Sequence, residues 1–200
     1  MPDWTRFYRA TQGRPPRETL LRALDLLEAE APPGLAIDLG CGAGRDTCEL
    51  LRRGWRVLAI DGEAEALDRL VGRHDLPHRC RLETRLQRFE DPAFALPACR
   101  LVNASFSIPF LPESTFRRLW TQVLSALEPG GCFAGQLLGV RDTWASRDGV
   151  TAFDRPGLDA LIAGTDIVWL EEREEDSTTV RGSPKHWHLF HLVLRKPRAP

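Results

Sequence analysis

Three glycines fall within five positions of the sequence, at Gly40, Gly42 and Gly44 in the stretch AIDLGCGAGRD. Glycine-rich turns between a strand and a helix typically hold a nucleotide-like ligand, because glycine lets backbone N–H groups approach the ligand closely. Two carboxylates flank the turn, Asp38 before it and Asp46 after it. The chemistry therefore depends on which ligand tolerates acidic neighbours.

Two common phosphate-binding patterns fit this turn poorly. A triphosphate loop needs a second glycine followed by lysine, where this chain has Arg45 and Asp46. A dinucleotide fingerprint needs its third glycine one residue later than Gly44. Two carboxylates at the mouth of the turn would repel a pyrophosphate, whereas they would attract an amine or a sulfonium.

A third acid indicates a nucleoside. Asp61 closes a predicted strand about 20 residues after Gly40, the distance at which an acid reaches a ribose diol in such folds. The glycines and the acids together predict a ligand with a free ribose, no phosphate and a cationic tail. S-adenosylmethionine fits that description.

Alternating strand and helix patterns predict the scaffold that positions these residues. Strands are predicted at 35–39, 55–61, 80–86, 99–106, 132–139, 166–176 and 186–196, and helices at 18–30, 45–54, 63–73, 112–131 and 155–164. The segment between the last two strands is too short for a crossover helix, so these strands should be antiparallel neighbours. We therefore expect an α/β, Rossmann-like, seven-stranded and mostly parallel sheet, with strand seven antiparallel and helices on both faces.

The prediction is a single domain over residues 1–200, in which 1–30 form an N-terminal lid and helix and 34–200 form the core. Ligands of such sheets bind outside the carboxyl ends of the parallel strands, so the loops after residues 39, 60, 86, 104 and 138 should form the site. The aromatic residues Trp4, Phe7 and Tyr8 suggest a lid over the cofactor.

The segment from Asp38 to Gly44, followed by Asp61, resembles motif I and the acidic loop of class I S-adenosylmethionine-dependent methyltransferases. The predicted strand order is similar to theirs over nearly the whole chain. The segments DWTRFYRATQGRPPRETL, NASFSIPF, GQLLGVRDTWA and KHWHLFHLVLRK resemble small single-domain methyltransferases related to the tellurite-resistance and thiopurine enzymes. The resemblance implies an enzyme that uses S-adenosyl-L-methionine for in-line methyl transfer to a small-molecule acceptor.

The resemblance also implies which positions hold the cofactor. They are Asp38, Gly40, Cys41, Gly42, Gly44, Asp46, Asp61, Gly62, Gln87, Arg88, Phe89, Ala104, Ser105 and Phe106. Many relatives carry an acid after strand three that hydrogen-bonds the adenine amino group. Here that region reads TRLQRFED, so either Gln87 or Glu90 could accept the same bond.

Residues after strand five and at the start of strand seven are predicted to contact the acceptor, because an antiparallel strand seven begins at the active-site edge. The predicted acceptor contacts are Tyr8, Arg141, Trp144, Lys185 and His186, with His188 as the group that takes a proton. The alternative interpretation is that Lys185, His186 and His188 belong to a solvated hairpin without a role in the site. A metal site at these histidines would lack a third ligand, so no metal is predicted.

The composition limits the classes of partner that we expect this chain to bind. The net charge of the 200-residue chain is −1, which supplies no basic field for nucleic acid or for an anionic membrane. The apolar runs are shorter than a membrane span, the N-terminus has no secretory pattern, and the five cysteines form no C-x-x-C pair. We expect a cytoplasmic monomer or homodimer whose partner is a small molecule. A non-catalytic S-adenosylmethionine-binding module and an NAD(P)-dependent oxidoreductase or epimerase are the alternatives.

Overall fold

The computed structural model describes residues 13–179 and 182–198. The aromatic residues of the predicted N-terminal lid, including Tyr8, lie outside the described residues. None of the described helices is long and apolar enough to cross a membrane.

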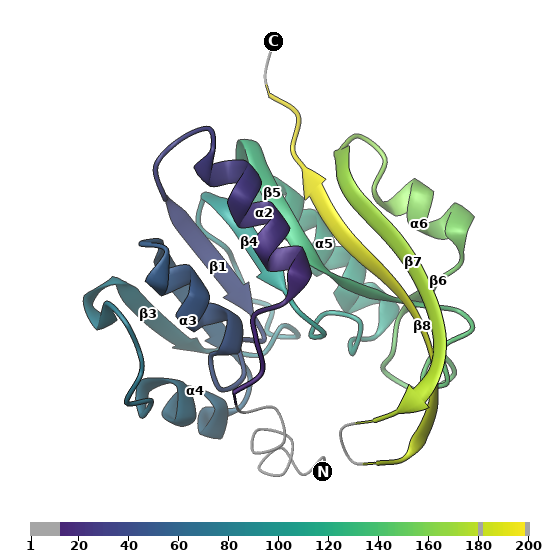
Figure 1. The fold of residues 1–200 in the computed structure, drawn as a ribbon. Coiled ribbons are helices and arrows are strands. Elements are labelled where there is room, and N and C mark those ends of the chain that lie inside the picture. The colour runs from purple at the N-terminus through teal and green to yellow at the C-terminus, as the bar shows by residue number, and fades with distance from the viewer. Residues whose placement is uncertain (1–12, 180–181, 199–200) are drawn as a thin grey trace.

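One mixed sheet organises the described chain (Figure 1). Its strands are β1 (Leu35–Leu39), β2 (Arg56–Asp61), β3 (Leu82–Leu86), β4 (Cys99–Ala104), β5 (Leu127–Gly139), β6 (Ala152–Phe153), β7 (Asp166–Thr178) and β8 (Pro184–Arg195). The order across the sheet is β3-β2-β1-β4-β5-β8-β7, and the short β6 pairs with β5. Strand β8 runs antiparallel to both β5 and β7, as predicted, while the other pairs are parallel.

Helices cover both faces of the sheet. The helices are α2 (Glu18–Glu28), α3 (Arg45–Arg52), α4 (Ala64–Val71), α5 (Glu113–Ala126) and α6 (Arg155–Leu161), with a 3₁₀ turn, η1, at Arg79–Arg81. Figure 1 shows α2 and α3 in front of the sheet and α5 behind it. Because the central strands are covered on both faces, they read as nearly continuous apolar runs rather than as alternating ones.

Two hydrophobic clusters fill the space between these layers. On one face, α2 buries Leu20, Leu24 and Leu27, whose three- and four-residue spacing forms a single stripe against β5 and β8. On the other face, α5 buries Phe116 and Trp120 against the sheet. The helices thus fix the strands, and the carboxyl ends of β1, β2, β4 and β5 gather at one edge.

The second half of the chain departs from the predicted boundaries. The helix predicted within 112–131, with a Pro-Gly-Gly stop at 129–131, ends at Ala126, and β5 begins at Leu127, five residues before its predicted start at 132. The early start is accommodated by an irregularity in the pairing of β4 with β5, between Cys99 and Leu101. The short β6 was not predicted, because two residues carry no periodic pattern.

Replacement of Phe116 by alanine tests the α5 side of the core. The Phe116 side chain is fully buried, stacks on Trp120 and contacts Phe153, so its loss leaves a cavity. We expect Phe116→Ala to lower the free energy of unfolding by about 3–5 kcal/mol in urea denaturation. Phe110→Ala is the control. Phe110 is 37% exposed, so its replacement should lower the free energy of unfolding much less. Equal losses for the two variants would contradict this description of the core.

Candidate functional site

The glycine turn after β1 is tightly enclosed. Gly40 and Gly44 have φ angles of +67° and +80°. A Cβ on Gly40 would lie 2.4 Å from the Cβ of Ser107, and one on Gly44 would lie 2.2 Å from Cδ1 of Leu70. Both positions therefore need glycine for conformation and for space, and the turn is held between α4 and the loop after β4.

Asp61, at the end of β2, lies directly against this turn. Its Oδ2 atom accepts a hydrogen bond of 2.9 Å from the backbone N–H of Gly42, and its Oδ1 atom accepts one of 2.9 Å from Glu63. Burial raises the pKa of the Asp61 carboxyl above its ordinary value. Each carboxylate oxygen can accept more than one hydrogen bond, so Asp61 can still receive the two hydroxyls of a ribose.

Asp38 is buried beneath the turn and joins three elements. It accepts hydrogen bonds of 2.5 Å from the Thr47 hydroxyl on α3 and of 2.8 Å from the Asn103 amide on β4. Burial, followed by the charge of Asp46, raises the pKa of Asp38 to about 7. The sequence analysis identified Asp38 but neither partner, since Thr47 and Asn103 have no distinctive spacing.

Asp46 connects this carboxylate cluster to the start of α2. Its Oδ2 atom accepts a 3.2 Å hydrogen bond from Asn103, and its Oδ1 atom accepts a 3.0 Å bond from the backbone N–H of Arg17. The Arg17 guanidinium lies 4.4 Å from the centre of the Phe106 ring, and burial lowers its pKa to about 10. The sequence analysis missed Arg17, a cation at the site that forms no ion pair with any described residue.

The other predicted cofactor positions differ in how they face this edge. Phe106, after β4, has a φ of +52°, a conformation that is costly for an aromatic residue and that clusters at functional sites. The Ser105 hydroxyl donates to Asn103 at 3.3 Å, whereas the side chains of Ala104 and Cys41 are buried in the core. Burial raises the pKa of the Cys41 thiol well above its ordinary value, which indicates packing rather than reactivity.

The loop after β3 lies beside Asp61. The backbone N–H of Gln87 donates to the Asp61 carbonyl at 3.0 Å, and the Gln87 side chain donates to Asp91 at 2.9 Å. The Arg88 side chain lies close to Gly62, because a Cβ there would be 3.2 Å from Arg88 Cγ. Phe89 packs edge-on against Phe94 and against the core. A role for residues 87–89 in binding adenine stays a prediction.

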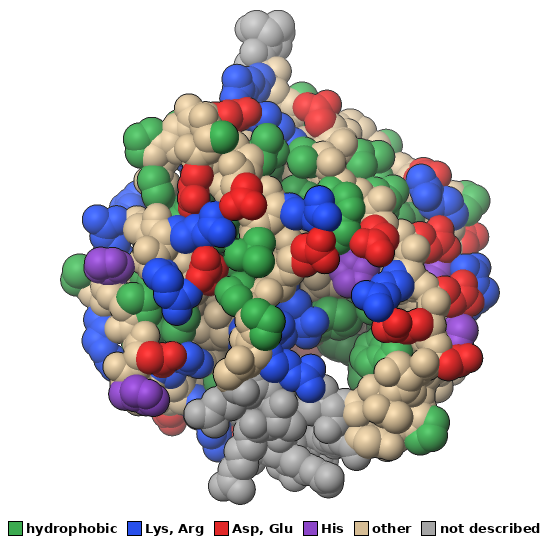
Figure 2. Space-filling view, viewed as in Figure 1, with side chains coloured by type: hydrophobic (Ala, Val, Ile, Leu, Met, Phe, Trp, Pro, Cys, Tyr) green, Lys and Arg blue, Asp and Glu red, His purple; other side chains and the backbone are tan. Residues whose placement is uncertain are grey.

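Four aromatic side chains lie together at the part of the edge where acceptor contacts were predicted, and we call Phe106, Phe110, Trp144 and Trp187 the aromatic wall. Consecutive ring centres are 5.8 Å apart for Phe110 and Trp144, 5.4 Å for Trp144 and Trp187, and 6.2 Å for Trp187 and Phe106. The wall runs from the loop after β4, through the loop after β5, to the start of β8. The face of the molecule at this edge is hollowed beside the hairpin of β7 and β8, and hydrophobic and basic side chains gather there (Figure 2).

Lys185 is buried inside the wall. Its ammonium lies 4.1 Å from the centre of the Trp144 ring and 4.0 Å from that of Trp187, and it forms an ion pair with Asp142. Asp142 also accepts hydrogen bonds from the backbone N–H groups of Trp144 and His188, at 2.9 and 3.1 Å. The pair therefore fastens the loop after β5 to β8. Two predicted acceptor contacts, Trp144 and Lys185, come together here.

Two other predicted acceptor contacts, Arg141 and His186, lie on the opposite face of the hairpin. Side chains alternate along β8, which places His186 there, and Arg141 reaches the same face from the loop after β5. Arg141 forms ion pairs with Glu172 and Glu174, and His186 contacts Glu174 and Asp176. These carboxylates raise the pKa of the exposed His186. The structure thus separates Arg141 and His186 from Trp144 and Lys185.

The placement of His188 does not support the predicted role in proton transfer. Its side chain is 1% exposed, Nδ1 accepts from the backbone N–H of Arg141 at 3.2 Å, and Nε2 lies 2.9 Å from a Glu172 carboxylate oxygen. Both ring nitrogens are therefore engaged, and the ring lies on the face away from the wall. His188 instead holds the loop after β5 in place.

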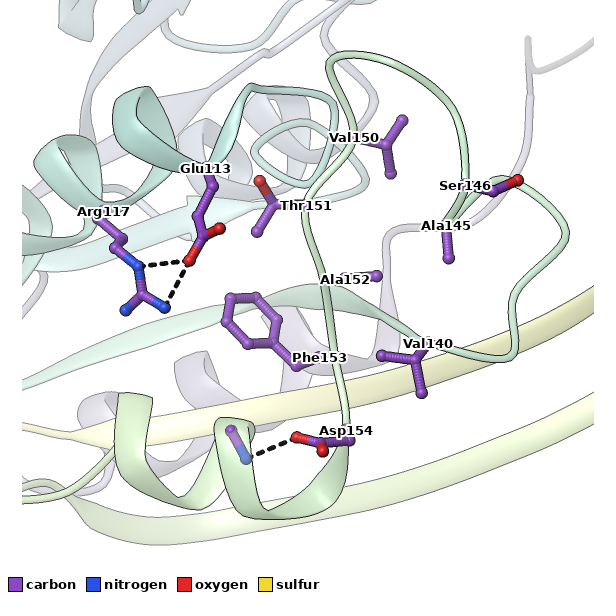
Figure 3. Close-up of a pocket in the computed structure, with 11 residues that line it drawn as sticks. Glu113, Arg117, Val140, Ala145, Ser146, Val150, Thr151, Ala152, Phe153 and Asp154 are labelled. Atoms are coloured by element: carbon purple, nitrogen blue, oxygen red, sulfur yellow. Dashed lines mark hydrogen bonds and ion pairs between the residues drawn. The ribbon is translucent and has the colours of Figure 1, made fainter.

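A separate open pocket of about 550 Å³ lies behind that loop (Figure 3). It is lined by small and apolar side chains such as Val140, Ala145 and Val150, by the Glu113–Arg117 ion pair, and by Asp154, which caps α6. The glycine turn and the carboxylate cluster do not line it. We therefore assign the site to the carboxyl edge of the sheet.

The chain is similar to known methyltransferases in sequence and in fold. Residues 36–131 match the family model described as a methyltransferase domain. Trans-aconitate 2-methyltransferase of Rhizobium meliloti (strain 1021) is 34% identical over 127 residues, which cover 62% of this chain and 44% of that protein. The match thus spans less than half of that relative's length.

Similar solved structures show the same fold. TehB from Haemophilus influenzae superposes with a TM-score of 0.68 at 17% identity, over 87% of this chain and 61% of that one. The N-methyltransferase NodS from Bradyrhizobium japonicum WM9, in complex with S-adenosyl-L-homocysteine, gives 0.67 at 18% identity, over 98% and 89%. The 1,6-didemethyltoxoflavin-N1-methyltransferase of Burkholderia thailandensis gives 0.62 at 18% identity, over 90% and 77%.

The raised pKa of Asp38 predicts a pH dependence of stability. An acid whose pKa rises on folding stabilises the fold while it is protonated, and this contribution is lost as the pH rises from about 4 to about 7. When the pH is raised from 5 to 8, the free energy of unfolding of the wild-type protein should fall by roughly 2–3 kcal/mol more than that of Asp38→Asn. Urea denaturation at both pH values measures this difference.

The control is Asp159→Asn, which removes a carboxylate that is 53% exposed on α6. This variant should follow the wild-type pH profile. A parallel pH dependence for wild type and Asp38→Asn would show that Asp38 titrates as it does in an unfolded chain.

Proposed function

We propose that this chain is a class I S-adenosylmethionine-dependent methyltransferase and that it passes a methyl group in line to a small-molecule acceptor. One observation carries the proposal: Asp61 is tied to the glycine turn through Gly42 and still has lone pairs for a ribose diol. We also propose that the protein is cytoplasmic, that it is a monomer or homodimer, and that it does not act on nucleic acid.

The residues at the edge fit such a cofactor. Asp38, Asp46 and Asp61 provide negative charge where a sulfonium and an amino group need it, and the enclosed glycine turn leaves no side chain in the way. Arg17 provides a cation without a described ion-pair partner, which suits the carboxylate of the methionine moiety. When bound, S-adenosylmethionine supplies a methyl group that is already activated for displacement.

The protein itself then has to align the acceptor with the methyl group and to enclose both. The aromatic wall would hold the acceptor beside the glycine turn and exclude water. The buried Lys185–Asp142 pair keeps Trp144 and Trp187 in place, since it fixes the loop after β5 against β8. No general acid is required, because the leaving group is a neutral thioether, and a base is required only for an acceptor that must lose a proton.

The alternatives are separated by binding measurements. Calorimetric titration with S-adenosylmethionine, S-adenosylhomocysteine, NAD and NADP should give binding of the first two only. Binding of a dinucleotide alone would favour the oxidoreductase. Tight S-adenosylmethionine binding without turnover on any acceptor would favour the regulatory module.

Substitution of Asp61 tests the ribose contact. We expect Asp61→Ala to weaken S-adenosylhomocysteine binding by roughly 1.5–3 kcal/mol, because the ribose hydroxyls lose a charged acceptor. Asp61→Asn keeps the size of the side chain and should lie between alanine and wild type. Calorimetry measures all three dissociation constants.

Glu63→Ala is the matched control. It removes a carboxylate that is 44% exposed but keeps the backbone N–H that donates a hydrogen bond to Asp61. It should bind like wild type. Unchanged affinity in both Asp61 variants would remove Asp61 from the site.

A further inference from the structure

We propose that the methyl acceptor is a carboxylate attached to a flat, unsaturated body, and that its product is a methyl ester. This inference rests on the proposed function. The relatives do not decide it, because their names include trans-aconitate for one protein and a nitrogen position for two others. The shape of this chain's own site, its charge and its lack of a free base favour such an acceptor.

The aromatic wall favours a flat acceptor. Its four rings follow one another at centre distances of 5.4–6.2 Å, with interplanar angles of 60–83°. Phe106, Trp144 and Trp187 are half-buried and Phe110 is 37% exposed, so each ring keeps surface that a bound molecule can cover. Rings in this arrangement present faces and edges to a second π-system at low cost in conformational entropy.

The charges that touch the wall are mostly positive. Arg147 lies 4.9 Å from the centre of the Trp144 ring, and Lys185 lies between the two tryptophans. Asp142 pairs with Lys185, whereas Arg147 forms no ion pair within residues 13–179 and 182–198. In a chain with a net charge of −1, this local excess of cations favours an anionic ligand.

This positive region lies opposite the acids of the cofactor half. Asp38, Asp46 and Asp61 belong to the glycine-turn side of the edge, where Asn103 and Gly42 hold them. The acids Glu172 and Glu174 lie on the other face of the hairpin and are engaged by Arg141 and the histidines. The site therefore separates a negative half, suited to a sulfonium, from a positive half, suited to an anionic nucleophile.

The described part of the wall also lacks a free general base. His188 has both ring nitrogens engaged, and His186 points to carboxylates on the other face of the hairpin. Both oxygens of Asp142 accept hydrogen bonds, from Lys185, Trp144 and His188. An amine or an alcohol would need such a base to lose its proton, whereas a carboxylic acid is already ionised at neutral pH.

The resulting step balances without a further reactant. A carboxylate oxygen forms a bond to the methyl carbon, the carbon–sulfur bond breaks, and its electron pair goes to sulfur. The products are a methyl ester and S-adenosylhomocysteine, and no proton leaves the acceptor. The residues of the wall contribute position and charge only.

The experiment uses S-adenosylmethionine labelled in its methyl group and the purified full chain. The acceptors are trans-aconitate, trans-cinnamate and benzoate, each beside its amide, together with benzylamine and benzyl alcohol as amine and alcohol counterparts of benzoate. We expect label to reach acids only and to be released as volatile methanol by mild base, which hydrolyses methyl esters. Label that reaches the amine or the alcohol and resists base would overturn the proposal.

Different results would contradict the proposed function and the acceptor assignment. If the protein does not bind S-adenosylhomocysteine, the proposed function is wrong and the acceptor assignment falls with it. If the protein binds S-adenosylhomocysteine but methylates none of these acids, the acceptor assignment alone is wrong.

Arg147 provides a test within the site. With the best acid acceptor, Arg147→Gln should raise KM about threefold to tenfold and change kcat little, because an exposed cation steers and orients the acceptor but does not react. Arg147→Lys should restore most of the loss. The control, Arg155→Gln, removes a similarly exposed arginine on α6 and should leave both constants unchanged. An unchanged KM in Arg147→Gln would contradict the role of Arg147.

Discussion

The site depends on how one buried carboxylate is held. Asp38 has almost no solvent contact, and it stays in place because Thr47 and Asn103 donate to it from α3 and β4. Through Asn103 the same network reaches Asp46, and through Asp46 it reaches the backbone of Arg17. A change at this point would therefore move the glycine turn, the start of α3 and the entry to α2 together.

The network has an energetic consequence as well as a geometric one. Burial is the main reason why the pKa of Asp38 and that of Asp61 rise rather than fall, and repulsion from the charge of Asp46 raises the pKa of Asp38 further. A cation placed among them would relieve this repulsion. The acids are thus arranged for a positively charged ligand, while the cations at the aromatic wall face the other half of the edge. The net charge of −1 for the whole chain does not reveal this local separation.

The sequence allowed the sheet to be predicted, and it placed the glycine turn beside acids at the ends of two strands, because glycine spacing and acids at strand ends are local signals. The acceptor half was predicted only in part. Trp144 and Lys185 lie at the wall, but strand alternation carries His186 and His188 to the opposite face, where carboxylates of β7 engage them. Arg17 was invisible to sequence reasoning, because its contact with Phe106 exists only once α2 packs across β5 and β8.

The central claim is that a nucleoside cofactor lies across the glycine turn with its reactive end toward the aromatic wall. A crystal structure with S-adenosylhomocysteine tests this most directly. The account predicts that both ribose hydroxyls lie within hydrogen-bond distance of Asp61 and that the sulfur faces the space beside Phe106 and Trp187. A ribose away from Asp61, or a sulfur turned away from the wall, would contradict it.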